Sequence, residues 1–92
     1  MKIMLEICGM LREKFPFDLH AFDLPEQSTV NDLIRRIDGH VGSQLPGSVW
    51  NREKKFFRGP ITLSSDGVVI TDYSIELKEN QHIKCNRFLI GG

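Results

Sequence analysis

The sequence has 92 residues and no excess of charge of either sign. Lysine and arginine number 12, and aspartate and glutamate also number 12, so the formal net charge is zero. A chain without a positive excess has no overall field that attracts nucleic acid or an anionic membrane. The length fits one compact domain and leaves no room for a second core. We therefore expect a single domain that binds neither nucleic acid nor membrane.

Cysteine is also scarce, since Cys8 and Cys85 are the only two and no C-x-x-C motif occurs. His20, His40 and His82 could join the cysteines as metal ligands, but without paired C-x-x-C motifs the spacing does not match that of a structural zinc site. His82 and Cys85 have one weak spacing, and strand alternation places their side chains on opposite faces. We therefore predict no metal site and no Cys–His nucleophile pair. Because we expect a cytoplasmic protein, both thiols should be reduced. Strand alternation places Cys8 and Cys85 on opposite faces, which predicts no disulfide between them, and Cys85 is expected to be a small buried hydrophobe.

Long hydrophobic runs and phosphate-binding loops are absent as well. The apolar run at residues 3–7 is short and contains Glu6, so it is neither a signal peptide nor a membrane span. We expect a cytoplasmic protein. Residues 39–47 contain glycines but lack the lysine and hydroxyl of a Walker motif. We therefore expect no bound nucleotide or other cofactor.

Alternating apolar residues are the first positive signal. Residues 2–8 and 17–22 alternate in this way and predict an N-terminal hairpin. Residues 61–63 and 68–70 predict a second hairpin, with Asp66-Gly67 as its tight turn. Residues 82–88 predict a last strand that runs into Gly91-Gly92.

One amphipathic helix is predicted between the hairpins. Thr29 is a good N-cap, and Asp32 three residues later completes a pattern like a capping box. Arg35 and Arg36 face away from the apolar stripe. The stripe follows helical spacing and consists of Val30, Leu33, Ile34, Ile37 and Val41. Gly39 or Gly42 is expected to end the helix.

This order of elements predicts an α+β fold in which the helix covers one face of a mixed sheet. If the first and last strands are central and adjacent, one set of side chains points toward the helix. That set is Ile3, Leu5, Ile7, Ile83 and Cys85.

The layout resembles the ubiquitin-like β-grasp fold, and within it the MoaD/ThiS family of sulfur-carrier proteins, nearest to the small subunit of molybdopterin synthase. The stretches that carry the likeness are "GMLREKF", "LPEQSTVNDLIRRI", "SSDGVVITDYSIELKENQHIK" and the final "GG". The two middle stretches are common in β-grasp domains. The Gly-Gly pair after the last strand is the specific part.

The resemblance implies that an E1-like adenylating enzyme uses ATP to activate the Gly92 carboxylate. Sulfur then replaces one oxygen, and the resulting thiocarboxylate donates sulfur to an acceptor enzyme. The favoured acceptor is a molybdopterin synthase large subunit, and thiamine or another sulfur-containing metabolite is an alternative. The chain itself is then a cosubstrate or non-catalytic subunit, and whether it counts as an enzyme stays open.

The domain is expected to span residues 1–92, with a flexible tail at about 87–92. Extended, Arg87 to Gly92 reaches roughly 20 Å. Gly91 keeps the tail slim enough to enter a narrow channel, because glycine has no side chain. The resemblance implies that the residues that bind partners are Arg87, Phe88, Leu89 and Ile90. Met4 and Phe88 mark a possible docking face, although for Met4 an ordinary sheet position is favoured.

Several alternatives stay open. A ubiquitin-like modifier would also present Gly92 for adenylation but would form an isopeptide bond to lysine, and a Gly-Gly pair can be a loose chain end. Residues 52–58 mix basic and aromatic side chains, which suggests nucleic acid. We interpret them as a solvated loop with two buried phenylalanines, because the net charge is zero and Glu53 interrupts the run. The sequence does not assign a role to residues 42–59.

Overall fold

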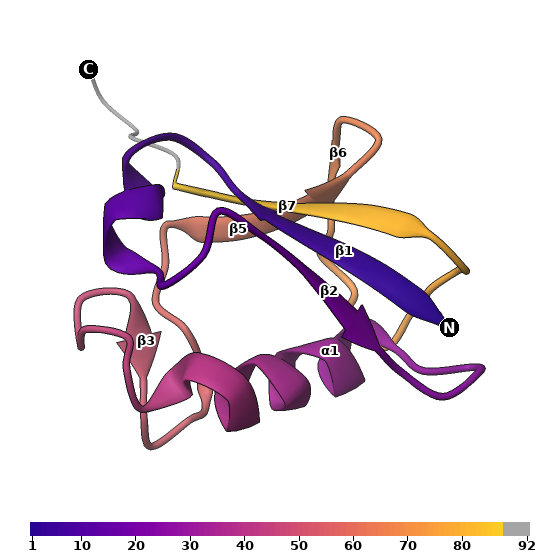
Figure 1. Ribbon diagram of the computed structural model, residues 1–92, viewed down its shortest axis with the longest axis horizontal. Coiled ribbons are helices and arrows are strands. Elements are labelled where there is room, and N and C mark those ends of the chain that lie inside the picture. The colour runs from indigo at the N-terminus through magenta and orange to yellow at the C-terminus, as the bar shows by residue number, and fades with distance from the viewer. Residues whose placement is uncertain (88–92) are drawn as a thin grey trace.

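The computed structural model describes residues 1–87 (Figure 1). The helical elements are the 3₁₀ helix η1 (Gly9–Lys14), the α-helix α1 (Val30–Ile37) and the π-helical turn η2 (Asp38–Gly42). The strands are β1 (Lys2–Ile7), β2 (Leu19–Asp23), β3 (Trp50–Asn51), β4 (Phe56–Phe57), β5 (Ile61–Ser65), β6 (Val68–Val69) and β7 (Gln81–Arg87). No helix among these residues is long and apolar enough to cross a membrane.

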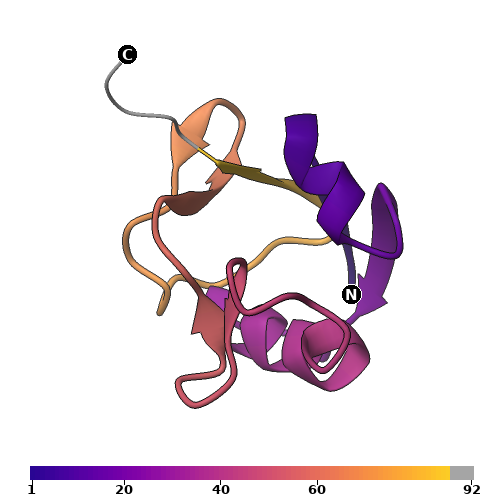
Figure 2. The same ribbon diagram turned by 90° about the vertical axis from the view of Figure 1, so that its left-hand side faces the viewer.

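The main sheet is mixed, as predicted, with the strand order β2-β1-β7-β5-β6. The first and last strands are adjacent and parallel, with Leu5 opposite Ile83. The other strand pairs are antiparallel. Figure 2 shows α1 on one side of this sheet, across the core from β1 and β7. The predicted α+β layout with one main helix is confirmed.

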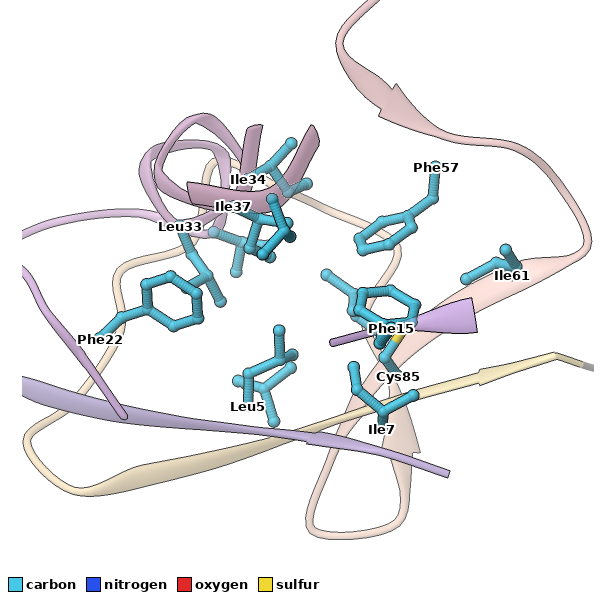
Figure 3. Packing of buried hydrophobic residues seen from close by; sticks show 14 of the residues in the cluster. Leu5, Ile7, Phe15, Phe22, Leu33, Ile34, Ile37, Phe57, Ile61 and Cys85 are labelled. Atoms are coloured by element: carbon cyan, nitrogen blue, oxygen red, sulfur yellow. The ribbon is translucent and has the colours of Figure 1, made fainter. Parts of the chain in front are cut away.

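The core lies between this sheet face and α1 (Figure 3). The side chains predicted to face the helix are all at most 1% exposed: Ile3, Leu5, Ile7, Ile83 and Cys85. Leu33 and Ile37 of α1 are fully buried against them. Both cysteines are free thiols, as predicted, with Cys85 buried and Cys8 half-buried.

The N-terminus of α1 has the predicted capping box. The Asp32 backbone N–H donates to Thr29 Oγ1, and the Thr29 N–H donates to Asp32 Oδ2 at 2.8 Å. Each bond satisfies a donor that the first helical turn leaves unpaired. Arg35 and Arg36 are exposed, as predicted. The α-helix ends at Ile37, before both predicted glycines, but the chain continues through the π-helical turn η2 to Gly42.

The turn between β5 and β6 is the predicted Asp66-Gly67 pair. Both residues have positive φ, 51° and 78°, as a tight hairpin turn of the primed type requires.

In β2 the core-facing position is Phe22, which pairs with Ile3 and is buried, whereas Leu19 and Ala21 are exposed.

Residues 42–59 contain a small hairpin, β3–β4, that packs beside α1 (Figure 2). Trp50 is fully buried, and its ring meets that of Phe57 edge-on at 4.8 Å. The prediction of two buried phenylalanines is correct for Phe57 only, because Phe56 is half-buried. Phe56 instead stacks on Tyr73, with ring centroids 5.1 Å apart. The hairpin extends the core beyond the main sheet.

Candidate functional site

The predicted tail follows β7, which is the central strand of the main sheet. Arg87, the last described residue, pairs with Ile61 of β5. On the other side of β7, the Cys8 N–H donates to the Cys85 carbonyl oxygen at 2.9 Å. The end of β7 is therefore hydrogen-bonded on both sides, and the tail begins from a fixed point.

Of the predicted tail residues, only Arg87 lies within the described part of the chain, where its side chain is exposed at the end of β7. A guanidinium can pair with a carboxylate, and the predicted role of Arg87 in partner binding stays a prediction. The predicted residues Phe88, Leu89, Ile90, Gly91 and Gly92 lie outside the described residues.

A hollow lies between η1 and the end of β7. Its walls come from residues 8–11, 13 and 14 on one side and from Asn86 and Arg87 on the other. Gly9 adopts φ +59° where the chain turns from β1 into η1. Leu11 is 3% exposed and anchors η1 on the core, whereas Met10 is 79% exposed. The hollow thus places an exposed apolar side chain beside the start of the tail.

Met10 is a candidate contact residue that the sequence analysis missed. A signal was available, because Met10 and Leu11 are adjacent apolar residues in a short helical turn, and adjacent residues of a helix do not share a face. One of them must therefore face solvent. The sequence does not say which one, because η1 has no amphipathic period long enough to orient it.

Neither thiol is suited to act as a nucleophile. Burial, and then the nearby Glu6 carboxylate, raise the pKa of Cys8. Burial, and then Cys8, raise the pKa of Cys85 to about 12. The thiolate is the reactive form of cysteine, and both pKa shifts favour the protonated thiol.

The sheet face away from α1 carries polar groups in its centre. His82 Nε2 lies 2.7 Å from Glu6 Oε1, across the β1–β7 pair. Met4 pairs with His82 in register and is half-buried. His82 is exposed while Cys85 is buried, so these two side chains lie apart, as the sequence predicted. Among residues 1–87, no three His, Cys, Asp or Glu side chains gather as a metal site would require.

The sequence matches no family model and no curated protein, but the structure is similar to solved ones. SAMP1 from Haloferax volcanii superposes with a TM-score of 0.77 at 14% identity, covering 99% of each chain. A second structure, of H. volcanii small archaeal modifier protein 1, gives 0.75 at 12% identity, covering 96% of this chain and 98% of that one.

A third similar structure is named for molybdopterin synthesis, the pathway of the resemblance stated above. It is a Pyrococcus furiosus protein assigned as molybdopterin converting factor subunit 1, with a TM-score of 0.64 at 18% identity. The match covers 91% of this chain and 93% of that one. The fold is the ubiquitin-like β-grasp. At these identities the likeness establishes the fold, and the β-grasp prediction is confirmed.

Proposed function

We propose that this β-grasp protein is a sulfur carrier whose Gly92 carboxyl group is activated and converted to a thiocarboxylate. The main supporting observation is that β7, the central strand of the sheet, is paired with β1 on one side and β5 on the other, so that Arg87, which precedes the predicted tail, is held in place. The structural similarity to a molybdopterin converting factor subunit supports this function. It also favours molybdopterin cofactor synthesis as the pathway.

The proposed chemistry has two steps, both at the Gly92 carboxyl group. The carboxylate oxygen attacks the α-phosphorus of ATP, which forms an acyl-adenylate and releases pyrophosphate. Hydrogen sulfide ion then attacks the acyl carbon and expels AMP, and the products are the thiocarboxylate, AMP and a proton. Adenylation is needed because a free carboxylate has no good leaving group.

The catalytic groups for both steps belong to partners in this proposal. An E1-like adenylating enzyme binds ATP and the tail, and an acceptor such as a molybdopterin synthase large subunit takes the sulfur. This chain contributes the reacting carboxyl group, a slim tail at Gly91, and contacts from Arg87, Phe88, Leu89 and Ile90. The exposed Met10 beside the tail start adds a further contact.

ATP–pyrophosphate exchange with the E1-like enzyme tests the proposal. The unaltered protein is expected to support exchange, and deletion of Gly92 is expected to abolish it with the fold intact. Gly91→Val should strongly reduce exchange, because the added methyl groups widen the tail. Gly47→Val is the matched control, since a β-carbon there meets no atom within 4 Å. Normal exchange by the Gly92 deletion would refute the proposal.

A ubiquitin-like modifier is the second candidate function. The two small archaeal modifier structures superpose with higher TM-scores, 0.77 and 0.75, than the converting factor subunit, 0.64. A modifier uses the same adenylated Gly92, but a lysine amine displaces AMP and forms an isopeptide bond. The two functions are separated by the final product, which carries sulfur in one case and a second protein in the other.

A further inference from the structure

Positive charge is concentrated in one part of this neutral chain. Six of the 12 cationic side chains fall between residues 35 and 58, where only Asp38 and Glu53 are acidic. The cationic residues are Arg35, Arg36, Arg52, Lys54, Lys55 and Arg58. This part of the sequence therefore has a net charge of +4, and the rest has −4.

The fold brings four of these cations onto one surface. A hollow between α1 and the β3–β4 hairpin has Arg35, Lys54 and Lys55 in its lining. A second hollow, on the hairpin, shares Lys54 and Phe56 with the first and adds Arg58. The two hollows are thus adjoining. We call Arg35, Lys54, Lys55 and Arg58 the basic surface, and all four side chains are exposed.

The hairpin tip that carries this surface is held in place. Asn51 Oδ1 accepts hydrogen bonds from the backbone N–H groups of Glu53 and Lys54, at 3.0 and 3.1 Å. Arg52 Nη2 donates to the Leu45 carbonyl oxygen at 2.6 Å. Below the tip, Trp50 is buried. A fixed backbone lowers the entropy lost when its side chains bind a partner.

Acidic groups also lie near this surface, because Asp38 is in the lining of the first hollow and Glu53 precedes Lys54 in the sequence. The stretch is nonetheless cationic, since its six cationic side chains outnumber these two carboxylates. Asp38 Oδ1 already accepts a hydrogen bond from Trp50 Nε1 at 3.0 Å. Arg35 contacts Asp32 at 2.6 Å, but this ion pair is exposed and spans one helical turn. Such pairs contribute about 0–1 kcal/mol, so a partner's carboxylate can readily displace Asp32.

The basic surface and the tail start lie at the same end of the molecule. Ile61 pairs with Arg87, and the Ile61 N–H donates to the Arg58 carbonyl oxygen at 3.1 Å. Figure 1 shows the hairpin and the end of β7 at the left, and β1 begins at the right. A protein that takes the tail can therefore reach the basic surface as well.

We propose that the basic surface docks on an acidic surface of the protein that takes the tail, and so assists its capture. The identity of that partner rests on the proposed function; the preference for an acidic protein surface does not. Single-stranded nucleic acid is disfavoured because it needs aromatic faces for stacking. Phe57 is buried, and Phe56 is already stacked on Tyr73.

A nuclear magnetic resonance titration tests the surface without any activity of the tail. The probes are a hexaglutamate peptide and an oligouridylate of equal charge. The peptide is expected to shift the amide signals of residues 51–58 and of Arg35, and the oligouridylate to shift them less. Lys54→Glu/Lys55→Glu should abolish the shifts. No shift with the peptide would overturn the proposal, and larger shifts with the oligouridylate would assign the surface to nucleic acid instead.

Kinetics with the E1-like enzyme test the role in capture. Lys54→Glu/Lys55→Glu is expected to raise the KM for this protein about tenfold at low salt with kcat unchanged. The difference should shrink at about 0.5 M salt, where charges are screened. The matched control is Lys2→Glu/Lys78→Glu, which makes the same change of charge at exposed positions near the opposite end of β1 and β7.

The two tests also separate this inference from the proposed function. Equal KM values for the variant and the control would overturn the role in capture. If the unaltered protein is not adenylated at all, the proposed function fails. The peptide titration then still decides whether the surface binds acidic groups.

Discussion

The indole Nε1 of Trp50 donates a hydrogen bond to Asp38 Oδ1 at 3.0 Å, which ties the β3–β4 hairpin to the π-helical turn after α1. The bond satisfies the polar atom of a ring that is otherwise fully buried. Gly42 lies against this pair: a β-carbon there would be 2.6 Å from Asp38 Oδ1 and 3.2 Å from Trp50 Nε1. The absence of a side chain at Gly42 therefore permits the hairpin to dock.

Gly42→Ala should consequently destabilise the protein. The added methyl group displaces the Asp38 carboxylate, so the indole N–H loses its partner; an unsatisfied buried donor costs about 1–3 kcal/mol. Gly39→Ala is the matched control, because a β-carbon there meets no atom within 4 Å. Urea unfolding of both variants measures the difference. Equal stability of the two variants would contradict the contact.

Stability should fall at alkaline pH because of the buried thiol. Burial raises the pKa of Cys85 from 9.0 to about 12, and burial also raises the pKa of Tyr73. Between about pH 9 and pH 12 the unfolded chain loses a thiol proton that the folded chain keeps, so stability decreases as pH rises. Below about pH 9 both states are protonated, and this effect is absent.

The check is the slope of unfolding free energy against pH in Cys85→Ala. The variant is expected to be less stable at every pH, because it leaves a cavity, but its stability should fall less steeply above about pH 9. Cys8→Ala serves as the comparison, since Cys8 is only half-buried. A Cys85→Ala slope as steep as that of the unaltered protein would show that another group controls the alkaline loss.

Met10 should matter for partner binding and not for stability. Its side chain is 79% exposed beside the tail start, so Met10→Ser should leave the free energy of unfolding within about 0.5 kcal/mol. The KM for the E1-like enzyme should rise. Val68→Ser is the matched control, because Val68 is 69% exposed on the edge strand β6. An unchanged KM in Met10→Ser would remove Met10 from the docking contacts.

Much of the fold was predictable because its signals are local. The capping box at Thr29 and Asp32 and the Asp66-Gly67 turn depend on residues close in sequence, and both are confirmed. The core face of β1 also follows from simple alternation. These features need no long-range contact to be specified, so single-sequence patterns suffice.

The β3–β4 hairpin was not predictable in this way. Its position depends on Trp50 reaching back to Asp38, 12 residues away, and on the space left at Gly42. No local sequence periodicity indicates such a contact. The exposure of Met10 in η1 depends likewise on which of two adjacent apolar residues meets the core. At the tail, the chemistry of Gly92 is implied by the family resemblance and stays a prediction, whereas the structure shows that the preceding strand is paired with β5 at Arg87.

The most direct test of the central claim is intact mass spectrometry of the protein after incubation with its E1-like enzyme, ATP and a sulfide donor. The account predicts a mass increase equal to the difference between sulfur and oxygen, mapped to Gly92 by fragmentation. No change with a demonstrably active enzyme would contradict it. Isopeptide adducts without a sulfur-bearing form would also contradict it and would assign the protein as a modifier.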